Sequence, residues 1–227
     1  MPFPDLPERL REVQGRIEAA VRRGGHGQRV TVVAVTKTHG PDAVTAAWES
    51  GLRDVGENRV QEALTKMDAV RVPVRWHLIG HVQRNKAKLV ARFHLVHSMD
   101  SPRLADAVDE IGRRGERPVD VLMQVNVVGE ASKGGYELET VQAEGERLRG
   151  MSGLRVRGVM TMAPLDAGES TLRTVFGGAR KAAETLRAVG HDATELSMGM
   201  SNDFEIAVEE GATFVRLGTI LFGARPA

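Results

Sequence analysis

Cysteine is absent from this sequence of 227 residues, and its absence excludes disulfides, iron–sulfur clusters, thiolate metal sites and cysteine nucleophiles. Long hydrophobic runs are absent too. Segments such as residues 32–35 are far shorter than the ~20 apolar residues that a membrane-spanning helix needs. Residues 1–9 lack the basic and apolar regions of a signal peptide. We therefore expect a soluble, cytoplasmic protein with no membrane partner.

The sequence also has no excess of charge of one sign and few aromatic side chains. Its 31 Lys and Arg residues are balanced by 30 Asp and Glu, which leaves a net charge of +1, and aromatic residues make up only 4 %. Nucleic-acid binding needs basic side chains to neutralise phosphates and rings to stack on bases. The histidines show no metal-binding spacing such as His-Glu-x-x-His. We expect neither a nucleic-acid partner nor a metal.

What the sequence does contain is a regular alternation of two kinds of segment. Short β-branched runs predict eight strands, at residues 30–36, 53–55, 74–79, 93–97, 119–127, 156–162, 195–198 and 213–217. Amphipathic stretches predict helices at residues 6–21, 41–48, 58–70, 82–91, 138–149, 171–189 and 203–210, with another beginning at the Ser101-Pro102 pair. Units of about 28 residues favour an α/β fold, a single-domain (β/α)8 barrel over residues 1–227 with an additional N-terminal helix.

Barrels of this kind carry their chemistry at the carboxyl ends of the strands, so the residues that follow each strand are the candidates for a site. Lys37 directly follows the first predicted strand. An amine at the mouth of an apolar barrel is partly desolvated, which lowers its pKa and frees its lone pair to form an imine. The alternative is a lysine whose stem packs on the strand end while its ammonium reaches solvent.

The second and third strands end in polar turns. Asn58 is either the N-cap of the helix that follows it or an amide presented to the barrel mouth. His77 and His81 are either acid–base groups or structural histidines.

The last two strands end in small, hydroxyl-bearing turns, at the two positions where phosphate sites recur in such barrels. Ser201 precedes a predicted helix whose N-terminal N–H groups favour an anion; the alternative is that Ser201 or Asn202 only caps that helix. Gly218 and Thr219 follow the eighth strand. Arg216 lies inside that strand, where a buried guanidinium needs an acceptor, either a ligand or a carboxylate within the barrel.

A lysine, an anion site and a buried arginine together favour a phosphorylated aldehyde as the ligand. Pyridoxal 5′-phosphate (PLP) offers an aldehyde for the amine, a phosphate for the hydroxyl-bearing turns and a ring nitrogen for the guanidinium. None of the three signals is specific alone.

Nine segments run in order along nearly the whole chain: residues 34–38, 56–62, 76–86, 97–101, 124–126, 133–135, 158–162, 196–203 and 215–223. On these segments the sequence resembles the pyridoxal phosphate homeostasis protein family, a relative of the alanine racemase N-terminal barrel (fold type III of the proteins that bind this cofactor). Leu78 and Arg84 depart from the residues commoner in the family, and neither lies at a position assigned to the cofactor. The resemblance implies a PLP-binding barrel.

The resemblance also implies a role for each candidate residue. Lys37 would carry PLP as an internal aldimine, and Arg216 would face the pyridine nitrogen. The phosphate would be held by Ser201, Gly218 and Thr219. The pocket lining would be completed by Asn58, His81, Ser197 and Met198.

A binding protein is favoured over an enzyme. Strong catalysis with this cofactor wants a protonated ring nitrogen, whereas Arg216 keeps its own charge and disfavours a second one on the ring. Racemases of this fold add a tyrosine acid–base from a second domain, and this sequence has one tyrosine, Tyr136, and no such domain. We expect a monomeric, non-catalytic protein of intracellular PLP homeostasis, with PLP-dependent apo-enzymes as its recipients.

Three alternatives stay open at this point. The chain could be a weak amino-acid racemase that uses PLP, or an aldolase that forms a lysine imine with a sugar phosphate. The third is an interaction scaffold built on a degenerate barrel, which would hold no ligand at its strand ends.

Overall fold

Eight parallel strands form a closed barrel in the part of the chain that the structure describes. The computed structural model covers residues 2–130 and 133–223, with the backbone alone at residues 84 and 85. The strands are β1 (Thr31–Val35), β2 (Asp54–Glu57), β3 (Arg75–Leu78), β4 (Leu95–Met99), β5 (Val119–Gln124), β6 (Leu154–Met160), β7 (Glu195–Ser197) and β8 (Phe214–Leu217). Each strand pairs with the next and β8 pairs with β1, which confirms the predicted (β/α)8 barrel.

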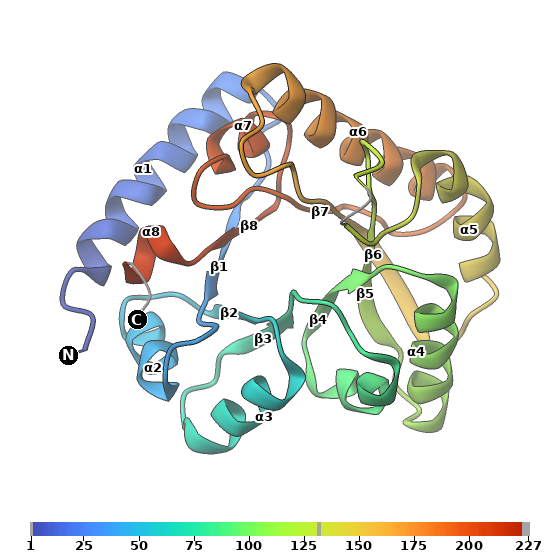
Figure 1. Ribbon diagram of the computed structural model, residues 1–227, viewed down its shortest axis with the longest axis horizontal. Helices are drawn as coiled ribbons and strands as arrows, with labels where there is room; N and C mark the ends of the chain where they lie inside the picture. The colour runs from blue at the N-terminus through green and yellow to red at the C-terminus, as the bar shows by residue number, and fades with distance from the viewer. Residues whose placement is uncertain (1, 131–132, 224–227) are drawn as a thin grey trace.

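Helices surround the barrel in chain order (Figure 1). The α-helices are α1 (Leu6–Gly24), α2 (Pro41–Glu49), α3 (Val60–Ala69), α4 (Pro102–Arg114), α5 (Val141–Leu148), α6 (Glu169–Ala188), α7 (Phe204–Glu209) and α8 (Thr219–Phe222). Two 3-10 helices, η1 (Arg84–Arg92) and η2 (Leu138–Thr140), lie in the connections that follow β3 and β5. Among these described helices, none combines the length and apolar character needed to cross a membrane.

Element boundaries differ from the prediction where contacts distant in sequence decide them. Residues 82–91, predicted as an α-helix, form the 3-10 helix η1, and α8 was not predicted. The fifth strand ends at Gln124, three residues before its predicted end, because Val125 pairs with Tyr136 in a separate bridge. The fourth strand begins two residues late because Phe93 still caps η1.

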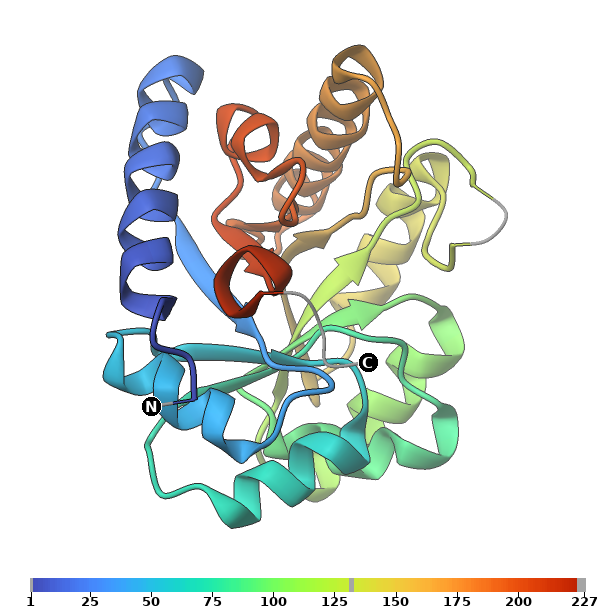
Figure 2. The ribbon, with the colours of Figure 1, turned by 60° about the vertical axis from the view of Figure 1, so that its left-hand side comes forward.

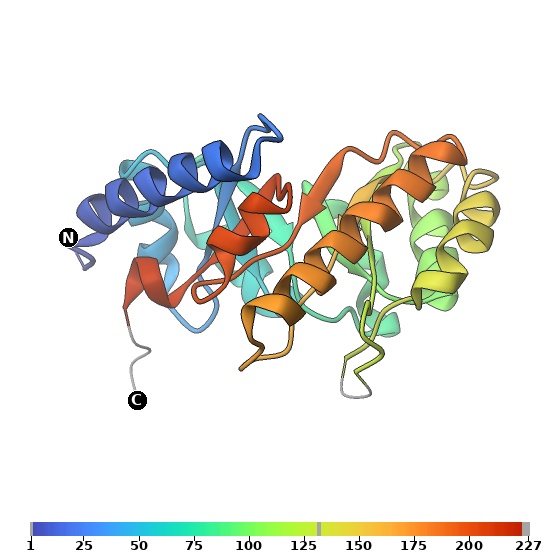
Figure 3. The same cartoon turned by 90° about the horizontal axis from the view of Figure 1, so that it is seen from above.

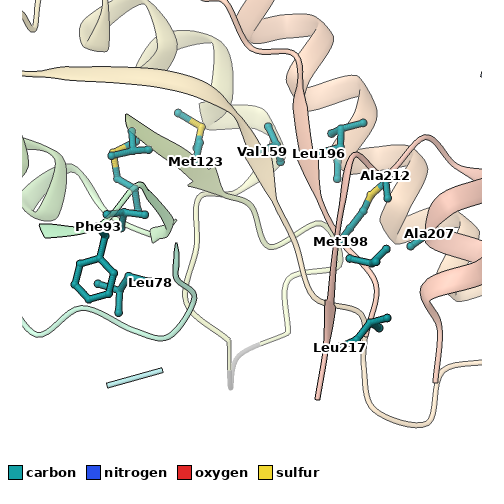
Figure 4. Packing of buried hydrophobic residues seen from close by; sticks show 14 of the residues in the cluster. Leu78, Phe93, Met123, Val159, Leu196, Met198, Ala207, Ala212 and Leu217 are labelled. Atoms are coloured by element: carbon teal, nitrogen blue, oxygen red, sulfur yellow. The ribbon is translucent and has the colours of Figure 1, made fainter. Parts of the chain in front are cut away.

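Side chains pack against both sides of the barrel wall, as expected for parallel strands buried on two faces. A small cluster inside the barrel contains Leu95, Leu122 and Met160, with Phe214 packed against it. The larger cluster lies between the strands and the helices, and Figure 4 shows part of it. Because both faces are buried, a polar side chain on a strand needs a hydrogen-bond partner within the protein.

Helix α1 covers the barrel beside α7 and α8, as Figures 2 and 3 show in blue and red. Its buried residues recur every three or four positions from Leu6 to Ala20, so they form one face. Arg16 on α1 donates to a carboxylate oxygen of Glu205 on α7 at 2.7 Å. The predicted leading helix is therefore confirmed, and it is joined to the last units of the barrel.

Helix α4 approaches the residue before β6 so closely that Gly112 has no room for a side chain. A Cβ there would lie 1.7 Å from the carbonyl oxygen of Gly153, whereas a Cβ at Gly15 in α1 would meet nothing within 4 Å. We expect Gly112→Ala to lower the free energy of unfolding by about 2 kcal/mol or more. Gly15→Ala should raise it by up to ~1 kcal/mol through helix propensity. Urea denaturation measures both, and similar effects of the two substitutions would contradict the close packing at Gly112.

Candidate functional site

A cavity of about 620 Å³ opens at the carboxyl ends of the strands. Six predicted site residues line it: Lys37, Asn58, Ser201, Arg216, Gly218 and Thr219. They come from β8 and from the segments that follow β1, β2, β7 and β8, and apolar side chains such as Val35 and Ile79 complete the wall. The barrel thus brings groups that are distant in sequence to one concave surface.

A second depression, of about 720 Å³, lies at the opposite end of the barrel between α1 and the beginnings of the first strands. Among the described residues that line it there is no lysine, and none of the nine predicted site residues. Its arginines, Arg29 and Arg53 among them, are exposed. Chemistry in barrels of this kind sits at the carboxyl ends of the strands, so the 620 Å³ cavity is the candidate site.

Three further residues, predicted to complete the pocket lining, lie outside the cavity. His81 is exposed, with its Nδ1 2.7 Å from Oδ2 of Asp100. Met198 is buried in the core between strands and helices (Figure 4). Ser197, the preceding residue, points the other way into the barrel and contacts Arg216. The prediction that these residues line the pocket is therefore wrong. Side chains alternate at the end of β7, so Ser197 and Met198 point into the barrel and into the outer core, and His81 lies at the surface.

Asn58 does not cap the helix that follows it. The N-cap of α3 is Arg59, and Asn58 lines the cavity instead. The loop after β3 passes directly over its backbone, because a Cβ at Gly80 would lie 2.4 Å from the carbonyl oxygen of Asn58. Only a glycine fits there without a shift of one of the two loops.

Ser201 does not cap its helix either. Helix α7 begins at Phe204 with Asp203 as its N-cap. The hydroxyl oxygen of Ser201 lies 3.4 Å from the backbone N–H of Ile220 and accepts from it, so it links the loop after β7 to α8. Gly218 is the N-cap of that short helix. The residues predicted to hold a phosphate are therefore neighbours in space.

Arg216 is 5 % exposed, although its side chain reaches the cavity wall. Its guanidinium donates to the hydroxyl of Ser197 at 2.7 Å and to the carbonyl of Thr161 at 2.9 Å. Burial lowers its pKa to about 10, and the nearby Asp203 opposes this shift. Within the described part of the chain no carboxylate forms an ion pair with Arg216, so the alternative of a salt-bridged arginine is wrong.

A line of hydrogen bonds continues from Arg216 across the interior of the barrel. The hydroxyl of Ser197 lies 2.8 Å from Nδ1 of His97. Nε2 of His97 lies 2.9 Å from Nδ1 of His77, whose Nε2 lies 2.9 Å from Oδ1 of Asp54. We call these five residues the interior relay. His77 is therefore neither in the cavity nor at the surface.

Asp54 is the anionic end of the interior relay. It is 3 % exposed, and Arg75 donates to its two oxygens at 2.7 and 2.5 Å. Burial opposes the ionisation of Asp54, but hydrogen bonds from His77 and Arg75 outweigh it and lower the pKa to about 2. The carboxylate is consequently ionised at neutral pH and can only accept hydrogen bonds.

The ionised carboxylate fixes the direction of the hydrogen bond next to it, since Asp54 can only accept. In the arrangement in which each histidine carries one proton, Nε2 of His77 donates to Asp54 and Nδ1 of His77 accepts from His97. His97 then donates through Nε2 and accepts at Nδ1 from the hydroxyl of Ser197. That hydroxyl oxygen is left to accept from Arg216. In this arrangement all four hydrogen bonds run in one direction, from the guanidinium to the carboxylate.

The single tyrosine of the sequence is not placed to act in the cavity. Tyr136 is 6 % exposed and is not among the lining residues. Its hydroxyl donates to Glu144 at 2.9 Å. Burial, with the Glu144 carboxylate beside it, raises the pKa of this hydroxyl well above its ordinary value. Tyr136 is thereby removed from acid–base chemistry at neutral pH.

Sequence reasoning missed the apolar wall and the acid of the cavity. Met162 and Leu165 follow β6, and Ile79 follows β3. Their position after a strand was a usable signal, but apolar side chains at such positions look like ordinary core residues. Asp203 also lines the cavity, and burial raises the pKa of its carboxyl group.

Comparison with known proteins shows the family to which this chain belongs. The family described as alanine racemase, N-terminal domain, matches residues 10–226. A relative from Aquifex aeolicus is 40 % identical over 222 residues (96 % of this chain, 97 % of the relative), and one from Pseudomonas aeruginosa is 42 % identical over 223 residues (97 % and 96 %). Both bear the name pyridoxal phosphate homeostasis protein. The chain belongs to this family, as its resemblance predicted.

Solved structures agree with this assignment. PipY of Synechococcus elongatus, solved without PLP, superimposes with a TM-score of 0.87 at 35 % identity, covering 96 % of this chain and all of PipY; its structure with PLP bound gives 0.85 at the same identity and coverage. Alanine racemase from Corynebacterium glutamicum, at 14 % identity and a TM-score of 0.71, shares the fold over 93 % of this chain and 60 % of its own. That last likeness speaks for the fold alone.

The interior relay makes a prediction about the protonation of His97. Burial, with His77 and Arg216 beside it, lowers its pKa well below 6.5. We expect long-range ¹H–¹⁵N spectra to show His97 neutral and protonated at Nε2, unchanged as the pH falls through 6.5. The unfolded chain takes up this proton, so the free energy of unfolding should fall as the pH drops below that value. A His97→Gln variant assigns the signal. A charged ring or an Nδ1-protonated one at pH 7 would contradict the direction of the relay.

Proposed function

We propose that this protein binds PLP reversibly, attached to Lys37, and serves PLP homeostasis without catalysing a reaction. We assign this role to one barrel domain over residues 1–227. The observation that carries the proposal is the convergence of an amine, a buried guanidinium and two hydroxyls, from Lys37, Arg216, Ser201 and Thr219, on one cavity. The names of the relatives and the PLP-bound structure of PipY support it.

The cavity fits the cofactor in size and in chemistry. Its volume of about 620 Å³ falls within the range of small-molecule sites, which is roughly 300–1,000 Å³. It is lined by apolar side chains suited to a ring and by hydroxyl groups suited to a phosphate. When bound, PLP supplies an aldehyde whose carbon forms a C=N bond to the Lys37 amine with release of one water.

Each lining residue then has a separate task. Ser201, Gly218 and Thr219 lie where the loops after β7 and β8 meet, and they would hold the phosphate. Arg216 would face the ring nitrogen, and Asn58 would lie beside the ring. The resemblance to the pyridoxal phosphate homeostasis family implies this division, and the meeting of these residues at one cavity supports it.

The charge of Arg216 argues against strong catalysis. With a pKa of about 10 it remains a cation at pH 7, and a cation facing the ring nitrogen disfavours protonation of that nitrogen. The hydroxyl of Ser197 and the carbonyl of Thr161 are neutral acceptors, so they support the arginine and leave the guanidinium charged. The buried Tyr136 supplies no proton to the cavity.

Release of the cofactor is favoured by the open side of the cavity. Leu165 borders it and is 81 % exposed, so this part of the rim is in contact with solvent. We extend the proposal to a cytoplasmic monomer that passes PLP to PLP-dependent apo-enzymes. A reversible covalent bond at an accessible cavity suits storage and delivery.

Lys37→Ala tests the attachment. We expect wild-type protein mixed with PLP to develop the long-wavelength absorbance of the covalent adduct, and Lys37→Ala to lose it completely because the amine is gone. Lys181→Ala, which removes an exposed lysine of α6, is the matched control and should behave as wild type. Mass spectrometry after borohydride reduction should place the adduct on the peptide that contains Lys37. An unchanged spectrum in Lys37→Ala would contradict the attachment of PLP to Lys37.

Turnover tests the absence of catalysis. We expect the PLP-loaded protein to leave L- and D-alanine unchanged, with no exchange of their Cα hydrogens in deuterated water, because the charged Arg216 disfavours a protonated ring nitrogen and Tyr136 lies outside the cavity. Proton NMR of the amino acid over a day measures this, with a known alanine racemase as the positive control. Racemisation, or deuterium at Cα, would make the protein an enzyme.

A further inference from the structure

A second group of buried charges lies directly behind Lys37, outside the cavity. It consists of Glu57 at the end of β2 and of Lys66 and Glu62 on α3, and we call these three residues the Lys66 cluster. Glu57 is fully buried, and Lys66 is 4 % exposed. The roles proposed above use none of the three, although a buried ammonium is costly unless it is fully paired.

The ammonium of Lys66 has all three of its donors occupied. It donates to Glu57 Oε1 at 2.7 Å and to Glu62 Oε1 at 2.9 Å. The third hydrogen bond, at 2.8 Å, goes to the backbone carbonyl of Thr36. Two of its partners are thus charged side chains, and the third is the residue that immediately precedes Lys37.

The carboxylates of the Lys66 cluster hold both neighbours of Lys37. Glu57 Oε1 accepts from the hydroxyl of Thr36 at 2.5 Å. Glu62 Oε1 accepts from the backbone N–H of Thr38 at 2.7 Å. Thr38 has a φ of +69°, a left-handed conformation that a β-branched residue seldom adopts and that persists only where its surroundings impose it.

We propose that the Lys66 cluster is the positioning device of the lysine that binds PLP. It holds the backbone on both sides of Lys37, so the amine enters the cavity in one orientation. This inference rests on the proposed function. The cavity is not lined by Lys66, Glu57 or Glu62, so we assign them as positioning residues.

Glu62 offers the cleanest test because its side chain is 25 % exposed. Without Glu62 the ammonium of Lys66 keeps Glu57 and the carbonyl of Thr36, whereas removal of Lys66 or Glu57 breaks the fully buried pair. Glu62→Ala removes the acceptor for Thr38, and Glu62→Gln keeps one at the same place. Thr36→Val tests the other side at nearly constant volume. Gln61→Ala, at an exposed position of the same helix, is the matched control.

Two ligands separate positioning of the amine from general damage to the cavity. Stopped-flow absorbance gives the rate of covalent attachment of PLP. Calorimetry gives the affinity for pyridoxine 5′-phosphate, which keeps the ring and the phosphate but carries an alcohol in place of the aldehyde. We expect Glu62→Ala and Thr36→Val to slow attachment about 10- to 100-fold while the affinity for pyridoxine 5′-phosphate changes less than about twofold. Glu62→Gln and Gln61→Ala should attach PLP at nearly the wild-type rate.

Attachment at the wild-type rate in both Glu62→Ala and Thr36→Val would overturn the inference. A parallel loss of affinity for pyridoxine 5′-phosphate would also overturn it, since the cluster would then only support the fold. These outcomes leave the proposed function intact. If the wild-type protein itself forms no adduct at Lys37, the proposed function fails, and the inference fails with it.

Discussion

A guanidinium enclosed by a barrel has to find its hydrogen-bond acceptors inside the protein, because water does not satisfy it there. Arg216 meets this requirement through Thr161 and Ser197. The hydroxyl of Ser197 in turn needs an acceptor, which His97 provides. His97 bonds to His77, and His77 bonds to the ionised Asp54, where the line of hydrogen bonds ends. An apolar residue at position 216 would need none of these polar partners. The polar middle of the barrel is thus the consequence of one buried charge.

The two cations that define the cavity are supported from different sides of the barrel wall. The interior relay holds Arg216 from within, and the Lys66 cluster holds the segment around Lys37 from the β2–α3 side. In both cases the supporting anion lies away from the cavity. Among its described lining residues Asp203 is then the one acid, and the remaining polar groups are neutral or cationic. Such a wall suits an anionic ligand that carries a carbonyl group.

The barrel fold and part of the candidate site could be predicted from the sequence. The eight strands follow from β-branched runs separated by amphipathic stretches, and the strand-end rule picked out Lys37 and Arg216 without any contact information. The loops could not be predicted in the same way. Asn58 and Ser201 both look like helix caps locally, yet α3 begins two residues after Asn58 and α7 three residues after Ser201, which leaves both side chains for the cavity.

The interior relay and the Lys66 cluster could not be predicted from the sequence, for a different reason. Each residue has a plausible separate reading, and only the barrel closure brings β3, β4 and β7 close enough for His77, His97 and Ser197 to meet. Glu57 and Glu62 read as ordinary polar residues of a turn and a helix. His81 was overrated because a histidine after a strand resembles a site residue, whereas its ring faces Asp100 at the surface.

The most direct measurement is a crystal structure of the protein soaked with PLP. We predict continuous electron density from Nζ of Lys37 into the cofactor, with the phosphate against Ser201, Gly218 and Thr219 and the ring nitrogen toward Arg216. Density for the cofactor only in the depression beside α1, or a Lys37 side chain unattached with no phosphate between the loops after β7 and β8, would contradict it.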